Sequence, residues 1–394
     1  MNRGDRDSSR ASLYDRLRPR QSTLEQMARQ QATPAPERHY DPERLRVIDG
    51  VALTAAGLVG WGNMPDKQAA VVDTSLAASE SLLVHRIDCQ FGTLGEPLAL
   101  QGDRARRLYE LARALVGEAM TLLERLPTEA GFEVVVSMPV EGHTTVLRDM
   151  LDVSLRGSLA YPRMTGLRLV PDHQDLHDTL ATPATGGAGH VLWLSIDCVL
   201  HAHGIGQLRA RQQLATTRNP QGIKPSEAAA ALVIQRIAED GYGGGDSYLL
   251  KRGIMLEHTR RTDLTRRQRH QSLAEILARV WPDEGATAGN APGVVVADSL
   301  DLPGRRADLA GALLTLWPEL DLGEECRCID YHFGWPGTAL IALQLVVALV
   351  GDRSRSGAVL LQLSDDHSSR ALALLPESLD SAAQARLESH YTTT

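Results

Sequence analysis

The residues best suited to metal or acid–base chemistry lie in one short stretch, 172–178. His173 and His177 are four residues apart, so on a helix both imidazoles share one face and could bind a single metal ion. Asp172 or Asp178 could supply a third ligand. Histidine pairs at this spacing without a general-base glutamate often arise by chance. We therefore favour a polar helix start, with Asp172 as the N-cap residue and both histidines at the surface.

The cysteines give no sign of a disulfide framework. Cys89 and Cys198 lie beside or within strand-like segments, where a free cysteine behaves as a small hydrophobic residue. Cys326 and Cys328 are separated by one residue, whereas a redox or metal pair usually has two residues between its cysteines. We assign no metal and no cofactor to them, and this cysteine usage is typical of a reducing cytoplasm.

Three further polar stretches carry weaker signals. His201 and His203 alternate on an extended segment and could form a ligand pair, but a plain turn is the better interpretation. The glycine-rich stretch 241–246 lacks the Lys-Ser/Thr of a P-loop, so we interpret it as a flexible connection. The basic stretch 260–270 has no nearby aromatic residues to stack on bases, and we interpret it as a solvated helix face.

Two blocks of small residues could position reactive side chains in a buried core. Residues 219–234 and 331–349 each begin with a turn that contains Gly and Pro and continue into a run of Ala, Leu and Val. Small residues allow close approach of backbones in a buried core. The apolar run 338–350 is too short to span a bilayer and predicts a core helix.

Strands and helices alternate along the rest of the chain. Short β-branched runs predict strands, and apolar positions at helical spacing predict amphipathic helices. The predicted strands cover 45–53, 132–138, 191–198, 294–298, 329–330, 358–363 and 370–375, and the helices cover 102–125 and 264–281. This alternation, which occurs twice over, predicts α/β layering.

Both small-residue blocks resemble landmarks of the thiolase-like superfamily, in particular of the β-ketoacyl synthases. Residues 222–230 are similar to that family's Gly-Phe-x-Pro-Gly-Glu-Gly-Ala-Ala segment, with Glu227 in place and two glycines replaced. His332, Gly334 and Gly337 match the family's Gly-His-x-x-Gly-Ala-Ala-Gly segment, if one residue is deleted before Gly334. The resemblance implies a five-layer αβαβα fold made of two similar halves.

The resemblance covers residues 45–376 and implies three regions. Residues 1–43 are rich in Arg, Gln, Ser and Pro, so they cannot bury enough surface to fold alone, and we predict a disordered N-terminal arm. We predict the N-terminal thiolase-like half at 44–260 and the C-terminal half at 261–394.

The resemblance also indicates which reactive residues are missing. A condensing enzyme needs a nucleophile that holds the acyl group, and Asp172 or His173 falls near that position, where neither can form a stable acyl thioester. Asp298 stands where the family carries a second active-site histidine, and His332 is the one histidine retained. A buried pair of Asp298 and His332 would then be a structural remnant. We predict that Asp172, Asp298 and His332 are degenerate positions and that the chain is a pseudoenzyme.

Charge and hydropathy restrict the partners. The 394-residue chain has a formal net charge of −8, which argues against binding driven by nucleic-acid phosphates. No opening segment has the layout of a signal peptide, so we expect a cytoplasmic protein without a membrane span.

The leading hypothesis is a non-catalytic accessory or binding protein. The chain looks like the degenerate thiolase-like proteins encoded in bacterial type VI secretion clusters, which implies a role in effector loading. Its expected partners are a secreted effector, an adaptor or a tip protein, and such folds also pair into homodimers. The alternative is a β-ketoacyl synthase-like acyltransferase or acyl-thioester-binding enzyme, which would retain a pocket holding His332 or a reactive thiol at Cys89 or Cys198. A metalloprotein that uses His173 and His177 is a third possibility.

Overall fold

The computed structural model describes residues 39–77, 80–88, 102–171, 175–183, 187–238, 247–281, 291–352 and 356–376. Most of the predicted N-terminal arm, residues 1–38, lies outside these ranges, and the first strand begins at Tyr40. The glycine-rich stretch 241–246 and the residues Cys89, Asp172 and His173 also lie outside the described residues.

The first part of the chain builds one set of five strands with helices between them. Its elements are β1 (Tyr40–Thr54), β2 (Gly57–Gly60), β3 (Val71–Asp73), β4 (Leu82–Val84), α2 (Asp103–Leu122), β5 (Phe132–Met138), α3 (Thr145–Arg156), β6 (Met164–Pro171), α4 (Leu176–Ala181), β7 (His190–Cys198), α5 (Ala202–Ala210) and β8 (Glu227–Ala238). The five main strands lie in the order β6-β5-β7-β8-β1, while β3 and β4 form a separate two-stranded ribbon.

The second part repeats this arrangement. Its elements are β9 (Tyr248–Lys251), β10 (Ile254–Glu257), α6 (Arg266–Val280), β11 (Val294–Ala297), α7 (Arg305–Leu316), β12 (Cys326–Cys328), α8 (Ile329–His332), the short 3₁₀ helix η5 (Gly337–Ala339), α9 (Leu340–Gly351), β13 (Ala358–Gln362) and β14 (Ser368–Pro376). Its five main strands lie in the order β12-β11-β13-β14-β9. If the five main strands of each half are numbered as they occur along the chain, both halves have the same order across the sheet: third, second, fourth, fifth, first.

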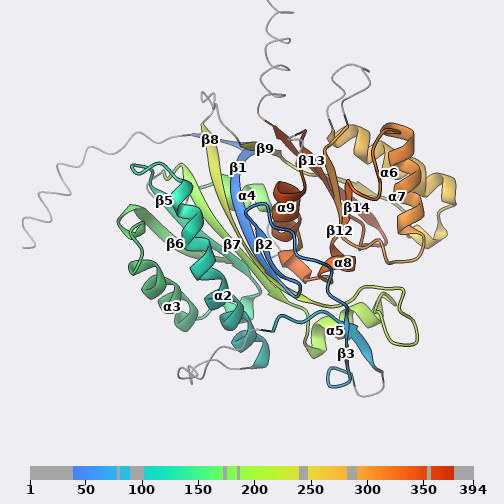
Figure 1. Ribbon diagram of the computed structural model, residues 1–394, viewed down its shortest axis with the longest axis horizontal. Coiled ribbons are helices and arrows are strands. Elements are labelled where there is room, and N and C mark those ends of the chain that lie inside the picture. Colours follow the sequence, from blue (N-terminus) through green and yellow to red (C-terminus); the bar gives the residue numbers. More distant parts are fainter. Residues whose placement is uncertain are drawn as a thin grey trace, which may run out of the picture. The chain divides into compact units, whose positions relative to one another are not determined.

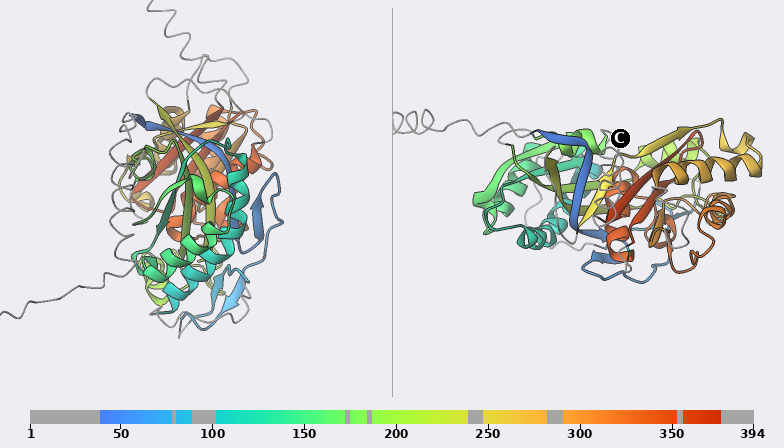
Figure 2. Two further views of the ribbon diagram at one scale, coloured as in Figure 1. Left: turned by 90° about the vertical axis from the view of Figure 1, so that its left-hand side faces the viewer. Right: turned by 90° about the horizontal axis from the view of Figure 1, so that it is seen from above.

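The equivalent first strands, β1 and β9, pair antiparallel and join the two sets of strands. This junction is visible at the centre of Figure 1, and Figure 2 shows the green elements of the first half beside the orange elements of the second. The predicted boundary between residues 260 and 261 stays a prediction, although the repeated strand order favours counting β9 and β10 with the second half.

Helices cover both outer faces and fill the space between the halves. One hydrophobic cluster joins α2 and α3 to the first set of strands, and another joins α6 and α7 to the second set. Between them, α4 and α9 contribute to a central cluster together with strands of both halves. These five layers form the αβαβα thiolase-like fold that the sequence resemblance implied.

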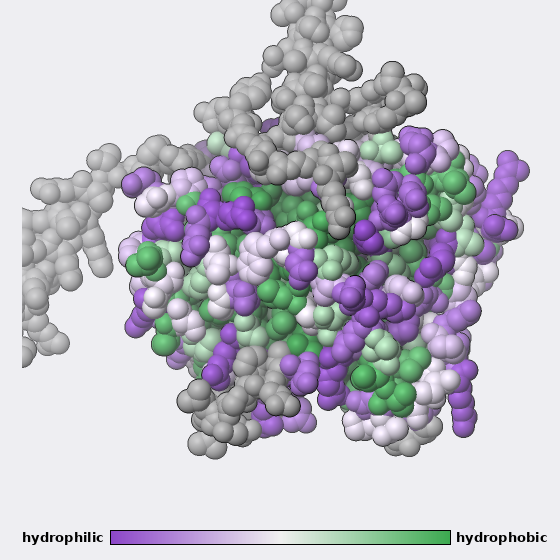
Figure 3. Space-filling view, viewed as in Figure 1, coloured by the Kyte–Doolittle hydropathy of each residue, from purple (hydrophilic) through white to green (hydrophobic). Residues whose placement is uncertain are grey.

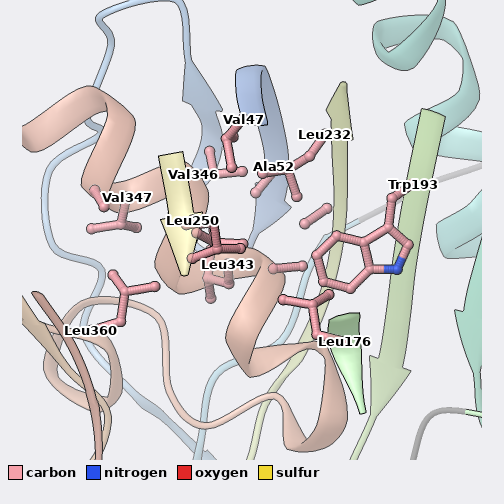
Figure 4. Packing of buried hydrophobic residues seen from close by; sticks show 14 of the residues in the cluster. Val47, Ala52, Leu176, Trp193, Leu232, Leu250, Leu343, Val346, Val347 and Leu360 are labelled. Carbon is pink, nitrogen blue, oxygen red and sulfur yellow. The ribbon is translucent and has the colours of Figure 1, made fainter. Parts of the chain in front are cut away.

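The helix α9 occupies the middle layer because nearly all of its surface is apolar, which suits a helix buried on every side. Its Leu343, Val346 and Val347 pack in the same cluster as Val47 of β1 and Leu360 of β13 (Figure 4). The predicted core helix at 338–350 is therefore confirmed, with its α-helical part beginning at Leu340.

Most predicted elements are confirmed, but the predictions for residues 329–330 and for His201 and His203 are wrong. Residues 329–330 begin the helix α8 instead of forming a strand, because the adjacent strand β12 ends at Cys328. His201 and His203 do not lie in a plain turn. His201 is the N-cap residue of α5, and His203 lies inside that helix. None of the helices in the described ranges combines the length and apolar character needed to cross a bilayer.

Candidate functional site where the two halves meet

The two small-residue blocks lie side by side, although residues 235–330 separate them along the chain. The backbone N–H of Ser226 donates to the carbonyl of Trp335 at 3.0 Å, and the N–H of Trp335 donates to the carbonyl of Lys224 at 2.8 Å. This bridge brings the start of β8 against the turn that leads into α9. The half-buried Trp335 packs against the central cluster and against the cluster that includes residues of α5.

Asp197, at the end of β7, fastens this turn to the first half. Its carboxylate is 3% exposed and accepts hydrogen bonds from the backbone N–H and the hydroxyl of Thr338, both at 2.9 Å. Arg104 of α2 donates to the other carboxylate oxygen at 3.0 Å. Burial raises the pKa of Asp197, and the bonds from Thr338 and Arg104 oppose that rise. Each carboxylate oxygen is therefore occupied by a fixed donor.

Glu227, the residue matched in the family segment, is also hydrogen-bonded at both carboxylate oxygens, and all of its bonding partners belong to the first half. Arg107 donates to its two carboxylate oxygens at 2.8 and 2.7 Å, in the bidentate geometry that arginine favours. The backbone N–H of Ile87 adds a third bond at 2.9 Å, and the thiol of Cys198 adds a fourth at 3.3 Å. Burial, and then the negative charge of Glu227, raise the pKa of Cys198, so the reactive thiolate is disfavoured there.

Asp298, at the position of the second family histidine, is fully buried. Its oxygens accept bonds from the backbone N–H groups of Leu363 and Ser364 at 2.6 and 3.1 Å. Burial raises its pKa. No hydrogen bond joins Asp298 to His332 among the described residues, so the suggested Asp–His pair is absent there. Instead the backbone N–H of Asp330 donates to the Asp298 carbonyl at 3.0 Å.

Asp330, which the sequence did not single out, is the more unusual carboxyl group. It is fully buried, and it accepts bonds from the Cys328 thiol at 2.5 Å and the Asp301 N–H at 3.1 Å. Burial raises its pKa to about 7. A carboxyl group with such a pKa can exchange a proton near neutral pH. The signal that could have found it is its place directly after a short strand, two residues before His332.

His332 lines a cavity of about 540 Å³ between α7, β12 and α8. Its ring Nδ1 is buried and has no hydrogen-bond partner in the described part of the chain, and burial lowers its pKa. Cys326 and Cys328 line the same cavity. Burial raises the pKa of Cys326 to about 11 and that of Cys328 well above its usual range, so neither thiol is activated.

Of the stretch predicted as a possible metal site, residues 175–178 lie within the described ranges. The N-cap residue of α4 is Asp175, which accepts bonds from the N–H groups of His177 and Asp178, so the prediction of Asp172 as the N-cap residue is wrong. His177 is fully buried and donates from Nε2 to the carbonyl of Leu250 at 3.2 Å, so the prediction that it lies at the surface is wrong. It turns inward because α4 belongs to the buried middle layer. No group of three His, Cys, Asp or Glu residues within the described ranges is placed to hold a metal ion.

The basic stretch 260–270 is only partly the solvated face that we predicted. Arg261 is 5% exposed, its side chain donates to the Ser369 hydroxyl, and its backbone N–H donates to the Asp366 carbonyl. It lines a second cavity, of about 450 Å³, together with Arg260, Arg269 and Arg305. Sequence analysis missed this cavity because its arginines come from separate segments of the chain.

Comparison with known proteins identifies the class of fold. No protein-family model matches the chain, and no curated protein matches it. Among solved structures, a type II polyketide-synthase acyl-carrier protein in complex with its ketosynthase bound to the hexaketide matches with a TM-score of 0.56 at 11% identity, covering 85% of this chain and 100% of that chain. The ishigamide ketosynthase/chain length factor matches with a TM-score of 0.51 at 13% identity, covering 84% of this chain and 99% of that chain.

An oxazolomycin ketosynthase domain of Streptomyces albus JA3453 also matches, with a TM-score of 0.51 at 11% identity, covering 85% of this chain and 74% of that chain. The chain therefore has the fold of the thiolase-like ketosynthases. At these identities the similarity describes the architecture and leaves the activity to be argued from the site.

Proposed function

We propose that this chain is a thiolase-like protein that no longer carries out condensation and acts by binding protein partners. The observation that carries this proposal is that the buried carboxylates and thiols of the site are already bonded or not activated. Asp197, Glu227 and Asp298 accept bonds from fixed amides or arginines, and burial raises the pKa of Cys198, Cys326 and Cys328. A condensing enzyme needs an activated nucleophile and free donors for the developing oxyanion.

The proposed partners are the effector, adaptor or tip protein of a type VI secretion cluster, and the proposed role is effector loading. A surface that fits protein binding lies on the β3–β4 ribbon, which stands apart from the large sheet (Figure 1). Val71 and Val72 of this ribbon are 49% and 59% exposed, and Trp61 nearby in sequence is 42% exposed. Grouped exposed apolar side chains mark interaction sites more often than single ones do. Elsewhere, on the face shown in Figure 3, hydrophobic and hydrophilic residues are interspersed.

The first experiment tests the chemistry. The folded protein is incubated with acyl-CoA and with acyl-carrier-protein thioesters, and its intact mass is measured. We expect no covalent acyl adduct. An adduct that maps to one cysteine or serine would contradict the proposal and would mean that the nucleophile has moved.

The second experiment tests the partners. Purified effector, adaptor and tip proteins from one secretion cluster are each passed over the immobilised chain, and retention is compared with that on the variant Val72→Asp. We expect one of them to be retained and the variant to lose it. Val153→Asp is the matched control, because Val153 is 66% exposed on α3, outside the ribbon. Equal loss in both variants, or no retention of any of the three, would argue against this role. Light scattering on the same sample tests the proposed homodimer.

The cavity beside His332 favours one second candidate, an acyl-thioester-binding protein. Its volume of about 540 Å³ lies in the usual range for small-molecule sites. Arg306 and Arg327 line it beside Leu309 and Leu313, so it offers both cationic and apolar walls. Saturable binding of acyl-CoA without an adduct would support this candidate over the purely protein-binding one.

A further inference from the structure

The cavity of about 450 Å³ at the start of α7 is distinct from the His332 cavity and is strongly basic. Five arginines from four separate segments line it, together with one acidic residue, Asp366. The full lining is Arg211, Gln212, Gln213, Arg260, Arg261, Thr262, Arg269, Leu302, Pro303, Gly304, Arg305 and Asp366. Arg305 is paired with Asp366 and Arg269 with the buried Asp308, whereas Arg211, Arg260 and Arg261 have no ion pair among the described residues. These three arginines leave an excess of positive charge around one concave site, which attracts anions.

Two of these arginines are buried and incompletely bonded. Arg305 is 3% exposed and donates from Nη2 to Asp366 at 2.6 Å, but its Nε and Nη1 have no hydrogen-bond partner among the described residues. Arg261 is 5% exposed and donates from Nη2 to the Ser369 hydroxyl at 2.5 Å, while its Nε is also without a partner. Leaving the N–H groups of a buried arginine without an acceptor costs free energy. The unbonded N–H groups of Arg261 and Arg305 therefore favour a ligand that supplies acceptor atoms in this cavity.

Two further features direct positive charge to the same place. The 12-residue helix α7 begins here, and its N-cap residue, Gly304, offers no side-chain bond to the first turn. Gly304 has a φ of 80°, which glycine adopts freely. The N–H of Arg305 donates to the Leu302 carbonyl at 3.2 Å, so a ligand would meet the N–H groups that follow it in the first turn. Arg211 and Arg260 are exposed and form no ion pair in the described part of the chain.

We propose that this cavity binds the phosphate group of a small phosphomonoester. A carboxylate has two oxygens, which one arginine can satisfy, whereas a phosphate has enough oxygens for Arg261, Arg305 and the start of α7 together. The unbonded acceptor Oε1 of the buried Gln213 suits a phosphate that carries one proton. The volume leaves room for the organic part of an ester. This site does not depend on the proposed partners or on the chemistry of the junction.

Isothermal titration of the full chain with phenyl phosphate, inorganic phosphate and benzoate, at one ionic strength, tests the proposal. We expect saturable binding of one phenyl phosphate per chain. Inorganic phosphate should bind more weakly, which separates the ester from the free ion, and benzoate more weakly still. Equal binding of benzoate and phenyl phosphate would overturn the assignment to phosphate, and so would the absence of saturable binding by both phosphate compounds.

Variants locate the binding. The double variant Arg305→Met/Asp366→Asn removes the buried cation together with its counter-charge, and it should weaken binding of phenyl phosphate about tenfold to a hundredfold. The double variant Arg211→Gln/Arg260→Gln changes only exposed residues, so it should fold normally and weaken binding about two- to fivefold. Arg279→Gln, in the last turn of α6 and paired with Glu275, lies outside the cavity and is the control. Binding that both double variants leave unchanged would place the ligand elsewhere and overturn the proposal.

Discussion

The two halves share one strand order, but they treat the buried acids at the ends of their strands differently. In the first half, Asp197 and Glu227 are each paired with an arginine of α2, Arg104 and Arg107. In the second half, Asp298 and Asp330 are bonded to backbone N–H groups and to a thiol, and neither has a cationic partner among the described residues. Arg261, Arg269 and Arg305 of the second half instead line an open cavity, together with Arg211 of the first half.

The two halves therefore differ in whether an arginine holds their buried carboxyl groups in place. Arg107 donates to both carboxylate oxygens of Glu227, so this buried acid ties α2 to the start of β8. A buried acid without a cation keeps its proton to a higher pH and can still change its charge. The buried acids of the first half are therefore held by arginines, while Asp298 and Asp330 of the second half have no cationic partner among the described residues.

Breaking an ion pair of the first half should give the largest effect. The variant Arg107→Met leaves the carboxylate of Glu227, which is 1% exposed, without its bidentate partner. We expect a loss of about 3 to 5 kcal/mol in the free energy of unfolding, measured by urea denaturation. The double variant Arg107→Met/Glu227→Gln should recover part of that loss, because no uncompensated charge remains.

The matched control is Arg106→Met on the same helix. Arg106 is 46% exposed and lies 3.9 Å from Asp103, so its loss should cost less than about 1 kcal/mol. Equal losses for the two variants would mean that the pairing of Glu227 does not stabilise the first half, and the comparison between the halves would fail.

In the second half, the effect of a buried acid should appear in how the free energy of unfolding depends on pH. The pKa of Asp330 is about 7 in the folded chain, above its ordinary value of 3.8, so the folded state holds a proton that the unfolded state has lost between these values. The contribution of Asp330 to the free energy of unfolding should therefore fall as pH rises from about 4 to about 7 and should level off above pH 7. His85 and His201, whose pKa values burial lowers to about 4, contribute in the opposite direction. The fall that Asp330 causes is about 2 to 4 kcal/mol.

The variant Asp330→Asn tests this, because an amide cannot ionise. Its free energy of unfolding, relative to that of the unmodified chain, should rise over the same pH window. Asp149→Asn on the exposed face of α3 should leave the profile unchanged. A difference between the unmodified chain and Asp330→Asn that is constant from pH 4 to pH 8 would contradict the raised pKa.

The sequence was sufficient for the elements with strong local patterns. Continuous β-branched runs predicted β5 and β7, and the uniformly apolar run after residue 338 predicted α9. The resemblance also singled out Glu227, which is buried and bonded in the structure. These predictions succeeded because each depends on neighbours along the chain.

The remaining features depend on contacts between distant segments. His177 looked like a surface residue because its flanking residues are polar, but the helix that carries it is enclosed by both halves. The basic cavity joins Arg211, Arg261, Arg305 and Asp366, which no local pattern links. Asp330 gained its raised pKa from burial beside Asp301, a contact that only the fold creates.

The smallest predicted effect tests how tightly the halves are joined. Gly337, in the turn before α9, has a φ of 67°, and a Cβ added there would lie 2.2 Å from the Asp197 carboxylate oxygen that accepts from Thr338. The variant Gly337→Ala should lose about 2 kcal/mol in urea denaturation, about half from backbone strain and about half from the displaced hydrogen bonds. Gly62→Ala separates the two contributions, because Gly62 has a similar φ of 73° and open space around it, so it should lose about 1 kcal/mol. If both variants lose the same amount, the turn of the second half moves aside freely. Asp197 would then be a feature of the first half alone and would not fasten the two halves together.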